Sequence, residues 1–289
     1  RRILHVLSSD FKIDDRNGIK NPIGLAGHRL EAKVLLVTSA INVEKDLQTC
    51  LEKTGISVID FVLEPLASAH SVLDENERKL GTILVDIGGG TTDVIVYYDG
   101  GVMHAGAIPI GGANITYDIA YGVQTTLEQA EKLKCGYGSA KSALSDPEEN
   151  INIKGTNGRD SKSISSKRLS EIIEPRMDEI FRLVKNEIRK SNYYGEYTFG
   201  IVLTGGGSRL KNINDLAQEI FQQPIKIGGP NLSRGVFEKV NNPRYSTAVG
   251  LIYYGIQNWS EIEYDNSINI NSIFKNPFIK INDFLKKWH

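Results

Sequence analysis

Residues 83–93 read ILVDIGGGTTD, and this stretch decides the fold. Its apolar, largely β-branched run predicts a buried strand that carries Asp86 to its end. Three glycines and two threonines follow: Gly88, Gly89, Gly90, Thr91 and Thr92. The glycines let the backbone curl so that its N–H groups can approach a phosphate, and the threonines add hydroxyl donors. Asp86 is suited to hold a hydrated Mg²⁺ through water. A plain glycine-rich hairpin is the alternative, but it needs no such acidic and hydroxyl groups.

A second glycine turn follows another apolar strand. Residues 202–208 read VLTGGGS and contain Gly205, Gly206 and Gly207. A tight turn alone would explain these glycines, and neither turn fits a G-x-G-x-x-G or Walker pattern. Two separated strand–turn units of this kind nevertheless predict a cleft with a nucleotide held from both sides.

The two turns resemble motifs of the actin, sugar-kinase and heat-shock chaperone superfamily. DIGGGTTD is similar to its second phosphate motif, and LTGGGS is similar to its adenosine motif. The resemblance implies a two-domain α/β ATPase fold that binds ATP and Mg²⁺ between its halves. It implies that Asp86 aligns Mg²⁺ or the attacking water, that residues 88–92 contact phosphates, and that residues 205–207 face the adenosine.

Three further charged residues resemble parts of that nucleotide site. Glu131 and Lys134 lie one helical turn apart and resemble the Glu and Lys that flank the ribose and base; an ordinary surface ion pair is the alternative. Glu64, in the stretch EPLA, resembles a carboxylate that orients the attacking water in several relatives. A helix-start residue favoured by the helix dipole would also explain Glu64.

Several stretches resemble the FtsA family of bacterial actin-like proteins in particular. They include DFKID at 10–14, GIKNPIGL at 18–25, GHRLEAKV at 27–34 and RYSTAVGL at 244–251. The superfamily begins with another phosphate-binding hairpin, and none precedes Arg1. We therefore expect a fragment that lacks about 80 residues, so that only the full-length protein completes the ATP site. The resemblance implies at most a weak ATPase.

The resemblance also implies a division into subdomains. Residues 1–38 correspond to the family-specific subdomain (1C-like) and 39–80 to the rest of domain 1A. Residues 81–123 and 200–257 form domain 2A with the return helix to 1A, and 124–199 form subdomain 2B. A flexible linker (258–273) and a terminal helix (274–289) follow. Periodicity predicts these strands and helices: strands at 3–7, 32–38, 58–63, 82–86, 94–98, 102–109, 151–154 and 201–203; helices at 43–53, 124–134, 168–190, 209–221 and 246–254.

The terminal segment FKNPFIKINDFLKKWH has an apolar stripe with lysines beside it. The stripe and its flanking lysines are Phe274, Phe278, Ile281, Phe284, Leu285, Trp288, Lys280, Lys286 and Lys287. Such a helix after a polar linker suits the interface of an anionic membrane. A helix docked on the core is the alternative. No apolar run is long enough to predict a transmembrane helix.

Composition excludes some other classes. The formal net charge of -1 gives no basic excess for nucleic acid, and the two cysteines, Cys50 and Cys135, have no metal-ligand spacing. The resemblance implies a polymerising, peripheral protein on the cytoplasmic face of the inner membrane at the division site, which tethers the FtsZ C-terminal tail and recruits later division proteins. A pilus-assembly scaffold of the same fold is the alternative; it would lack the terminal helix. A sugar kinase or chaperone would need a further domain after residue 250.

Overall fold

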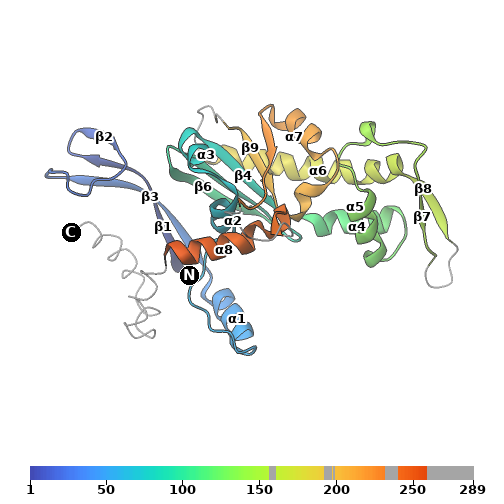
Figure 1. Ribbon diagram of the computed structural model, residues 1–289, viewed down its shortest axis with the longest axis horizontal. Coiled ribbons are helices and arrows are strands. Elements are labelled where there is room, and N and C mark those ends of the chain that lie inside the picture. Colours follow the sequence, from blue (N-terminus) through green and yellow to red (C-terminus); the bar gives the residue numbers. More distant parts are fainter. Residues whose placement is uncertain (156–160, 192–196, 198, 232–239, 259–289) are drawn as a thin grey trace.

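The computed structural model describes residues 1–155, 161–191, 197, 199–231 and 240–258. Its centre is a five-stranded sheet in the order β10-β9-β4-β5-β6 (Figure 1). These strands are β4 (Thr82–Ile87), β5 (Thr92–Tyr98), β6 (Gly101–Ile108), β9 (Ile201–Thr204) and β10 (Ile225–Ile227). β4, β9 and β10 run parallel, whereas β4, β5 and β6 form an antiparallel meander. Parallel strands need a long connection, and the segment that joins β4 to β9 contains β5, β6 and several helices.

Helices cover both faces of this sheet, so β4 is apolar over the three successive residues 83–85 and buried along its whole length. Ile83, Val85 and Leu203 face α4 (Gly112–Gly122), α6 (Ser166–Arg189) and α7 (Ile213–Phe221). The alternate residues Leu84 and Val202 face α2 (Glu64–Val72), which α8 (Ser246–Gln257) crosses. α3 (Glu75–Leu80) precedes β4 and is closed by a capping box between Asp74 and Glu77.

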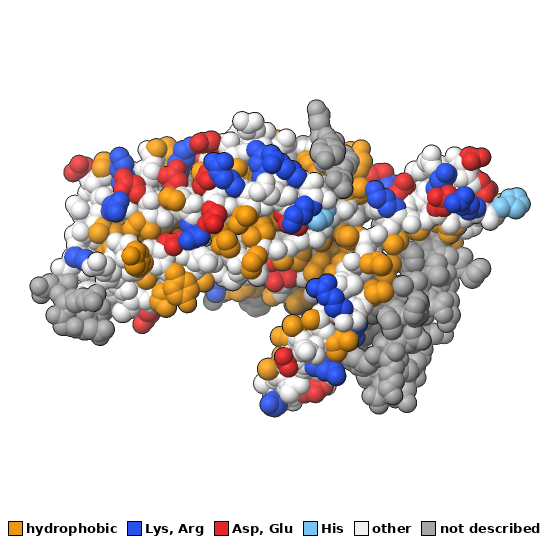
Figure 2. Space-filling view, turned by 180° about the vertical axis from the view of Figure 1, so that it is seen from behind, with side chains coloured by type: hydrophobic (Ala, Val, Ile, Leu, Met, Phe, Trp, Pro, Cys, Tyr) orange, Lys and Arg blue, Asp and Glu red, His pale blue; other side chains and the backbone are white. Residues whose placement is uncertain are grey.

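A separate antiparallel sheet lies at the N-terminal end, in the order β2-β1-β3. Its strands are β1 (Arg2–Ile13), β2 (Arg16–Ile19) and β3 (Leu30–Ser39). The helix α1 (Ile41–Glu52) follows and projects from the body of the molecule, with hydrophobic side chains exposed along it (Figure 2). Glu44 is its one buried residue and pairs with Arg2.

Part of the chain between the two glycine turns forms the opposite end of the molecule (Figure 1). It contains α5 (Leu127–Tyr137), the 3₁₀ turn η1 (Ser142–Leu144) and a hairpin of β7 (Asn150–Ile153) with β8 (Lys162–Ser165). The long helix α6 then returns to the central sheet. Its predicted apolar stripe is the core contact, since Leu169, Ile173 and Met177 are fully buried.

Most predicted elements are confirmed. The elements β2, α3, β8 and β10 were not predicted, and three details were wrong. Residues 58–63 form no strand: the Leu63 N–H donates to the His5 imidazole, and the segment has no ladder partner among the described strands. α1 starts at Ile41, two residues before the predicted start at residue 43. The single strand predicted at 151–154 corresponds to β7, and it pairs with a second strand, β8. The predicted helix at 209–221 is divided into η2 (Gly206–Arg209) and α7.

Within the described ranges, no helix combines the length and apolar character needed to cross a membrane. The predicted linker from residue 259 onward and the predicted helix at 274–289 lie outside the described residues.

The crossing of α2 and α8 generates a stability prediction. A Cβ at Gly250 would lie 1.8 Å from the Ala67 carbonyl oxygen, whereas a Cβ at Gly255, on the same helix, would meet no atom within 4 Å. We expect Gly250→Ala to lower the free energy of unfolding by about 1–3 kcal/mol, because the helices must move apart. The control Gly255→Ala should raise it by about 0.5–1 kcal/mol through helix propensity. Urea unfolding of both variants measures the difference; equal midpoints would contradict the close crossing.

Candidate functional site

The two glycine turns meet at one edge of the central sheet. The parallel pairing of β4 with β9 sets Asp86 opposite Thr204, so both turns begin at the same level. Gly205 has a φ of +82°, and a Cβ there would lie 2.2 Å from Asp86 Oδ1. A Cβ at Gly207 would lie 2.3 Å from the Ile87 side chain. Gly205 and Gly207 are therefore required by the packing of one turn on the other.

The first turn is held from behind by the start of α4. The Gly88 N–H closes the turn on the Thr91 carbonyl at 3.0 Å. The carbonyls of Gly88 and Gly89 accept from Gly112 N at 2.9 Å and Ala113 N at 2.8 Å. These helix N–H groups have no partner within α4, so the turn satisfies them.

This contact also fixes which way the turn's own N–H groups point. The carbonyl and the N–H of a trans peptide point in opposite directions, and the described residues contain no cis peptide. With the Gly88 and Gly89 carbonyls directed at α4, the N–H groups of Gly89 and Gly90 are directed away from it. Both residues are exposed. The turn therefore presents two adjacent donors to an anion.

The two turns contain six glycines, at 88–90 and 205–207, and the packing of the fold does not require three of them. At Gly89, Gly90 and Gly206 an added Cβ would meet no atom within 4 Å, and none of the three has a positive φ. A larger residue would fit the protein at these positions. Close approach of a ligand to the backbone is a physical reason for glycine there.

Asp86 is buried between the turns and the α2–α8 pair. Its Oδ2 accepts hydrogen bonds from Ser68 Oγ at 2.6 Å and Thr247 Oγ1 at 3.3 Å. Burial raises the pKa of Asp86 because it disfavours the charged form, and the hydrogen bonds from Ser68 and Thr247 oppose this increase only in part. The carboxylate is thus oriented by two helices of the opposite layer.

Two more carboxylates lie near Asp86. Asp93 is its cross-strand partner, is buried, and accepts from Thr91 Oγ1 at 2.9 Å. Glu64 begins α2 and stays accessible to solvent. Burial raises the pKa of Asp93, and the negative charge of Asp86 adds to this effect. Partial burial, then the charges of Asp93 and Asp86, raise the pKa of Glu64. Together the three carboxylates make a place where a cation would be stabilised.

This carboxylate group is not a direct metal cage. In the part of the chain that the structure describes, no three His, Cys, Asp or Glu residues are arranged to hold a metal ion directly. The arrangement suits a hydrated cation held through water, as Mg²⁺ prefers. Asp93 was missed by sequence reasoning, although its position beside the turn and opposite Asp86 in the predicted hairpin could have identified it.

Not every predicted phosphate donor lies at the turn surface. Thr91 is partly exposed, and its hydroxyl donates to Asp93. Thr92 is fully buried, and its hydroxyl donates to the Ile110 carbonyl at 2.8 Å. The Thr92 side chain therefore supports the strand–helix connection and is set apart from the other candidate residues.

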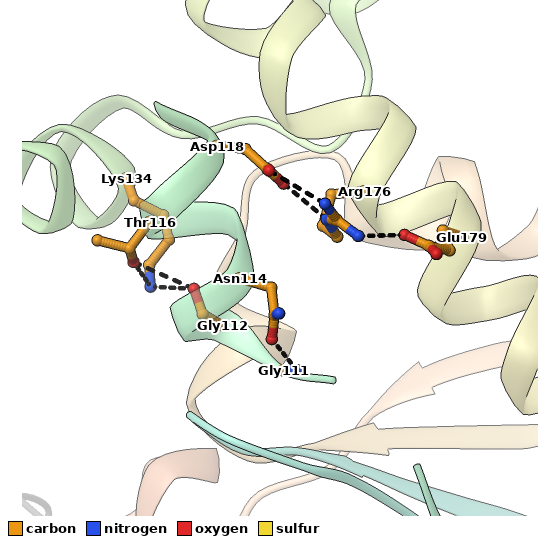
Figure 3. A network of polar contacts seen from close by, with 8 residues as sticks. All are labelled: Gly111, Gly112, Asn114, Thr116, Asp118, Lys134, Arg176 and Glu179. Atoms are coloured by element: carbon orange, nitrogen blue, oxygen red, sulfur yellow. Dashed lines mark hydrogen bonds and ion pairs between the residues drawn. The ribbon is translucent and has the colours of Figure 1, made fainter. Parts of the chain in front are cut away.

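Glu131 and Lys134 form more than a surface ion pair. They pair at 2.7 Å, but the Lys134 side chain is only 13% exposed and its Nζ reaches the Gly112 carbonyl, at the start of α4 (Figure 3). Burial of the Glu131 carboxyl tends to raise its pKa. Hydrogen bonds from Lys134, Thr116 and Cys135 outweigh that effect and hold the pKa below its ordinary value. The structure thus connects both residues to the first glycine turn through α4.

This architecture defines a class of protein. A mixed sheet covered by helices on both faces, with two glycine turns meeting at its edge, is an actin-like α/β fold. MreB5 of Spiroplasma citri bound to ADP matches 78% of this chain and 68% of its own, with a TM-score of 0.64 and 22% identity. A PilM–PilN type IV pilus biogenesis complex matches 80% of this chain and 63% of its own, with a TM-score of 0.60 and 16% identity. At these identities the similarity shows the fold alone.

Sequence comparison gives the family. The model of cell division protein FtsA matches residues 83–250, and that of the SHS2 domain inserted in FtsA matches residues 1–38. The chain is 43% identical to cell division protein FtsA of Pseudomonas aeruginosa over 261 residues, which are 90% of this chain and 63% of that protein. It is 36% identical to that of Escherichia coli K12 over 297 residues, 99% of this chain and 70% of that protein. The chain belongs to the FtsA family, as its motifs predicted.

The contrast between neighbouring glycines of the second turn can be tested. Gly205→Ala should lower the free energy of unfolding by about 1–3 kcal/mol, because it combines a positive φ with a clash against Asp86. Gly206→Ala should change it by less than about 0.5 kcal/mol, because its Cβ faces open space. Chemical denaturation of the two variants is the measurement. Equal destabilisation would mean that the turns do not pack as described.

Proposed function

We propose that the full-length protein containing this chain binds ATP, polymerises, and tethers FtsZ to the cytoplasmic membrane. The observation that supports this most is the pair of glycine turns, which places two outward N–H groups beside a buried carboxylate. Family membership supports the division role. The chain spans 63% of the Pseudomonas aeruginosa relative, so the activity and partners of the whole protein are part of the proposal.

The nucleotide would lie against the two turns. Gly89 and Gly90 N–H groups would contact phosphate oxygens, with Gly88 and Thr91 completing that turn, and Gly206 would let adenosine approach the backbone. Asp86 would hold Mg²⁺ through water, and the ion would neutralise phosphate charge. Asp86 and Glu64 are the candidates for orienting an attacking water. Any ATPase activity would be weak and would require the first phosphate hairpin of the full-length protein.

Polymerisation would use the two ends of the molecule. ATP would favour head-to-tail protofilaments in which residues 1–38 meet subdomain 2B, residues 124–199, of the next protomer. Residues 39–80, 81–123 and 200–257 would form the actin-like body between these ends. The positions of the N-terminal sheet and the β7–β8 hairpin at opposite ends of the long axis support this arrangement (Figure 1).

Membrane attachment would come from the terminal segment. Residues 274–289 carry the aromatic stripe and lysines that suit an anionic membrane surface, and residues 258–273 would link them to the body. Attachment would be peripheral, on the cytoplasmic face at the division site, and polymerisation would strengthen it by avidity. The FtsZ tail and later division proteins would bind the cytosolic face. The pilus-scaffold alternative is less well supported, because the sequence relatives are division proteins.

Nucleotide binding can be separated from folding at the glycines that the fold does not require. In the full-length protein, Gly89→Val and Gly206→Val should each weaken ATP binding by at least about tenfold, because a side chain blocks backbone approach. Thermal unfolding of the unliganded variants should stay close to wild type, since both positions face open space. Titration calorimetry measures the affinity. Wild-type affinity in both variants would refute the site.

The tether can be tested by co-sedimentation of the full-length protein with anionic liposomes and a labelled FtsZ tail peptide. A version that ends at Ser272 is the matched control. We expect the peptide to pellet only with the intact protein, because the terminal stripe and lysines supply the membrane contact. Pelleting with both versions would place the membrane contact elsewhere. Pelleting with neither would favour another actin-like scaffold.

A further inference from the structure

The Lys134 side chain bonds to groups of the protein itself, which a residue that only binds a nucleoside does not need to do. An ammonium group has three N–H donors. Lys134 Nζ lies 2.8 Å from the Gly112 carbonyl oxygen, 2.8 Å from Thr116 Oγ1 and 2.7 Å from Glu131 Oε2. All three donors therefore have acceptors within the protein, and two of those acceptors belong to the first turns of α4.

Gly112 connects this lysine to the phosphate turn. Its carbonyl oxygen accepts from Lys134, and its N–H donates to the Gly88 carbonyl at 2.9 Å. The Gly88 carbonyl belongs to the same peptide group as the Gly89 N–H, which points away from α4. A displacement of Gly112 would release the Gly88 carbonyl and allow this peptide to rotate. Lys134 thus reaches the Gly89 N–H through two hydrogen bonds and three peptide groups, those that join residues 112–113, 111–112 and 88–89.

Other contacts hold α4 without reaching the turn in this way. Asn114 Oδ1 accepts from the Gly111 N–H at 3.0 Å and closes the start of the helix. Further along α4, Asp118 forms a two-point pair with Arg176 of α6, at 2.6 and 3.0 Å (Figure 3). These contacts fix the axis of α4. Lys134, by contrast, reaches from α5 to the carbonyl of Gly112, the first residue of α4.

We propose that Lys134 is a positioning residue, which clamps the first turn of α4 so that the Gly89 and Gly90 N–H groups face the phosphates. This rests on the proposed nucleotide site and assigns the lysine to phosphate recognition, acting through the backbone. The nucleoside side of the site is left to Glu131, whose side chain is 50% exposed.

The test compares Lys134→Met with Lys132→Met in the full-length protein. Lys132 lies on the same helix and forms an exposed ion pair with Glu128, so the second variant matches the loss of charge and ion pair. Calorimetry would measure the affinities for ATP, ADP and adenosine. Hydrogen–deuterium exchange without nucleotide would follow the peptides that cover residues 86–92 and 111–116.

We expect Lys134→Met to weaken ATP and ADP binding by about tenfold, the effect of losing one charge-assisted hydrogen bond, and to leave adenosine binding within about twofold. Exchange in the two peptides should also become faster. Lys132→Met should change neither quantity. Equal losses for ATP and adenosine with unchanged exchange would make Lys134 a nucleoside ligand and overturn the proposal, as would wild-type behaviour in both measurements.

The two proposals fail in different ways. If the unsubstituted full-length protein bound neither ATP nor ADP, the proposed nucleotide function would be refuted. The exchange measurement would still decide the clamp, because it uses no nucleotide. Unchanged exchange in Lys134→Met would refute the clamp even if the nucleotide function were established.

Discussion

The parallel pairing of β4 with β9 is the constraint on which the rest of this structure depends. The strands are far apart in the sequence, and their register sets Asp86 beside Thr204, so that the turn after each strand starts at the same level. The second turn can then pack against the first only where side chains are absent, at Gly205 and Gly207. The segment between the two strands first adds β5 and β6 to the same sheet and then returns through helices, the first of which, α4, closes behind the first turn.

Buried hydroxyl groups connect the same sheet edge to the helices on its other face. Ser68 and Thr247 bond Asp86, and Thr204 and Ser246 bond each other at 2.6 Å. These bonds lower the energetic cost of the buried carboxylate without removing it. A raised pKa means that the folded state disfavours the ionised form relative to the unfolded chain. The destabilisation is absent below a carboxyl's ordinary pKa and complete above its raised folded-state pKa, so the carboxylates near the turns oppose folding at neutral pH. Groups kept in place at such a cost are more common at functional sites than elsewhere.

Short sequence patterns predicted those strands and helices whose formation depends mainly on neighbouring residues in the chain. The buried strand β4, the neighbouring strands β5 and β6, and the apolar stripe of α6 follow from short patterns. The strand expected at 58–63 has the right composition, but no strand in the described part of the chain lies beside it to pair with, which no local pattern can reveal. In the same way, Thr92 belongs to the phosphate motif by sequence, yet its hydroxyl serves Ile110 because β5 turns that side chain into the core.

The three-glycine runs show why the sequence predicted a candidate site but did not distinguish the roles of its glycines. In the run 205–207 the outer glycines are required by the packing of the turns, and the middle one is not. In the run 88–90 the packing leaves space at Gly89 and Gly90, because the carbonyls of the turn are taken by α4. The same hydrogen bonds satisfy the first N–H groups of α4 and turn the peptide groups outward. One contact therefore completes a helix terminus and creates an anion-facing surface. The packed glycines are therefore required by the fold, and the open ones are not. In the proposed site, substitutions at the open glycines would change what the turns can bind and leave the packing of the turns intact.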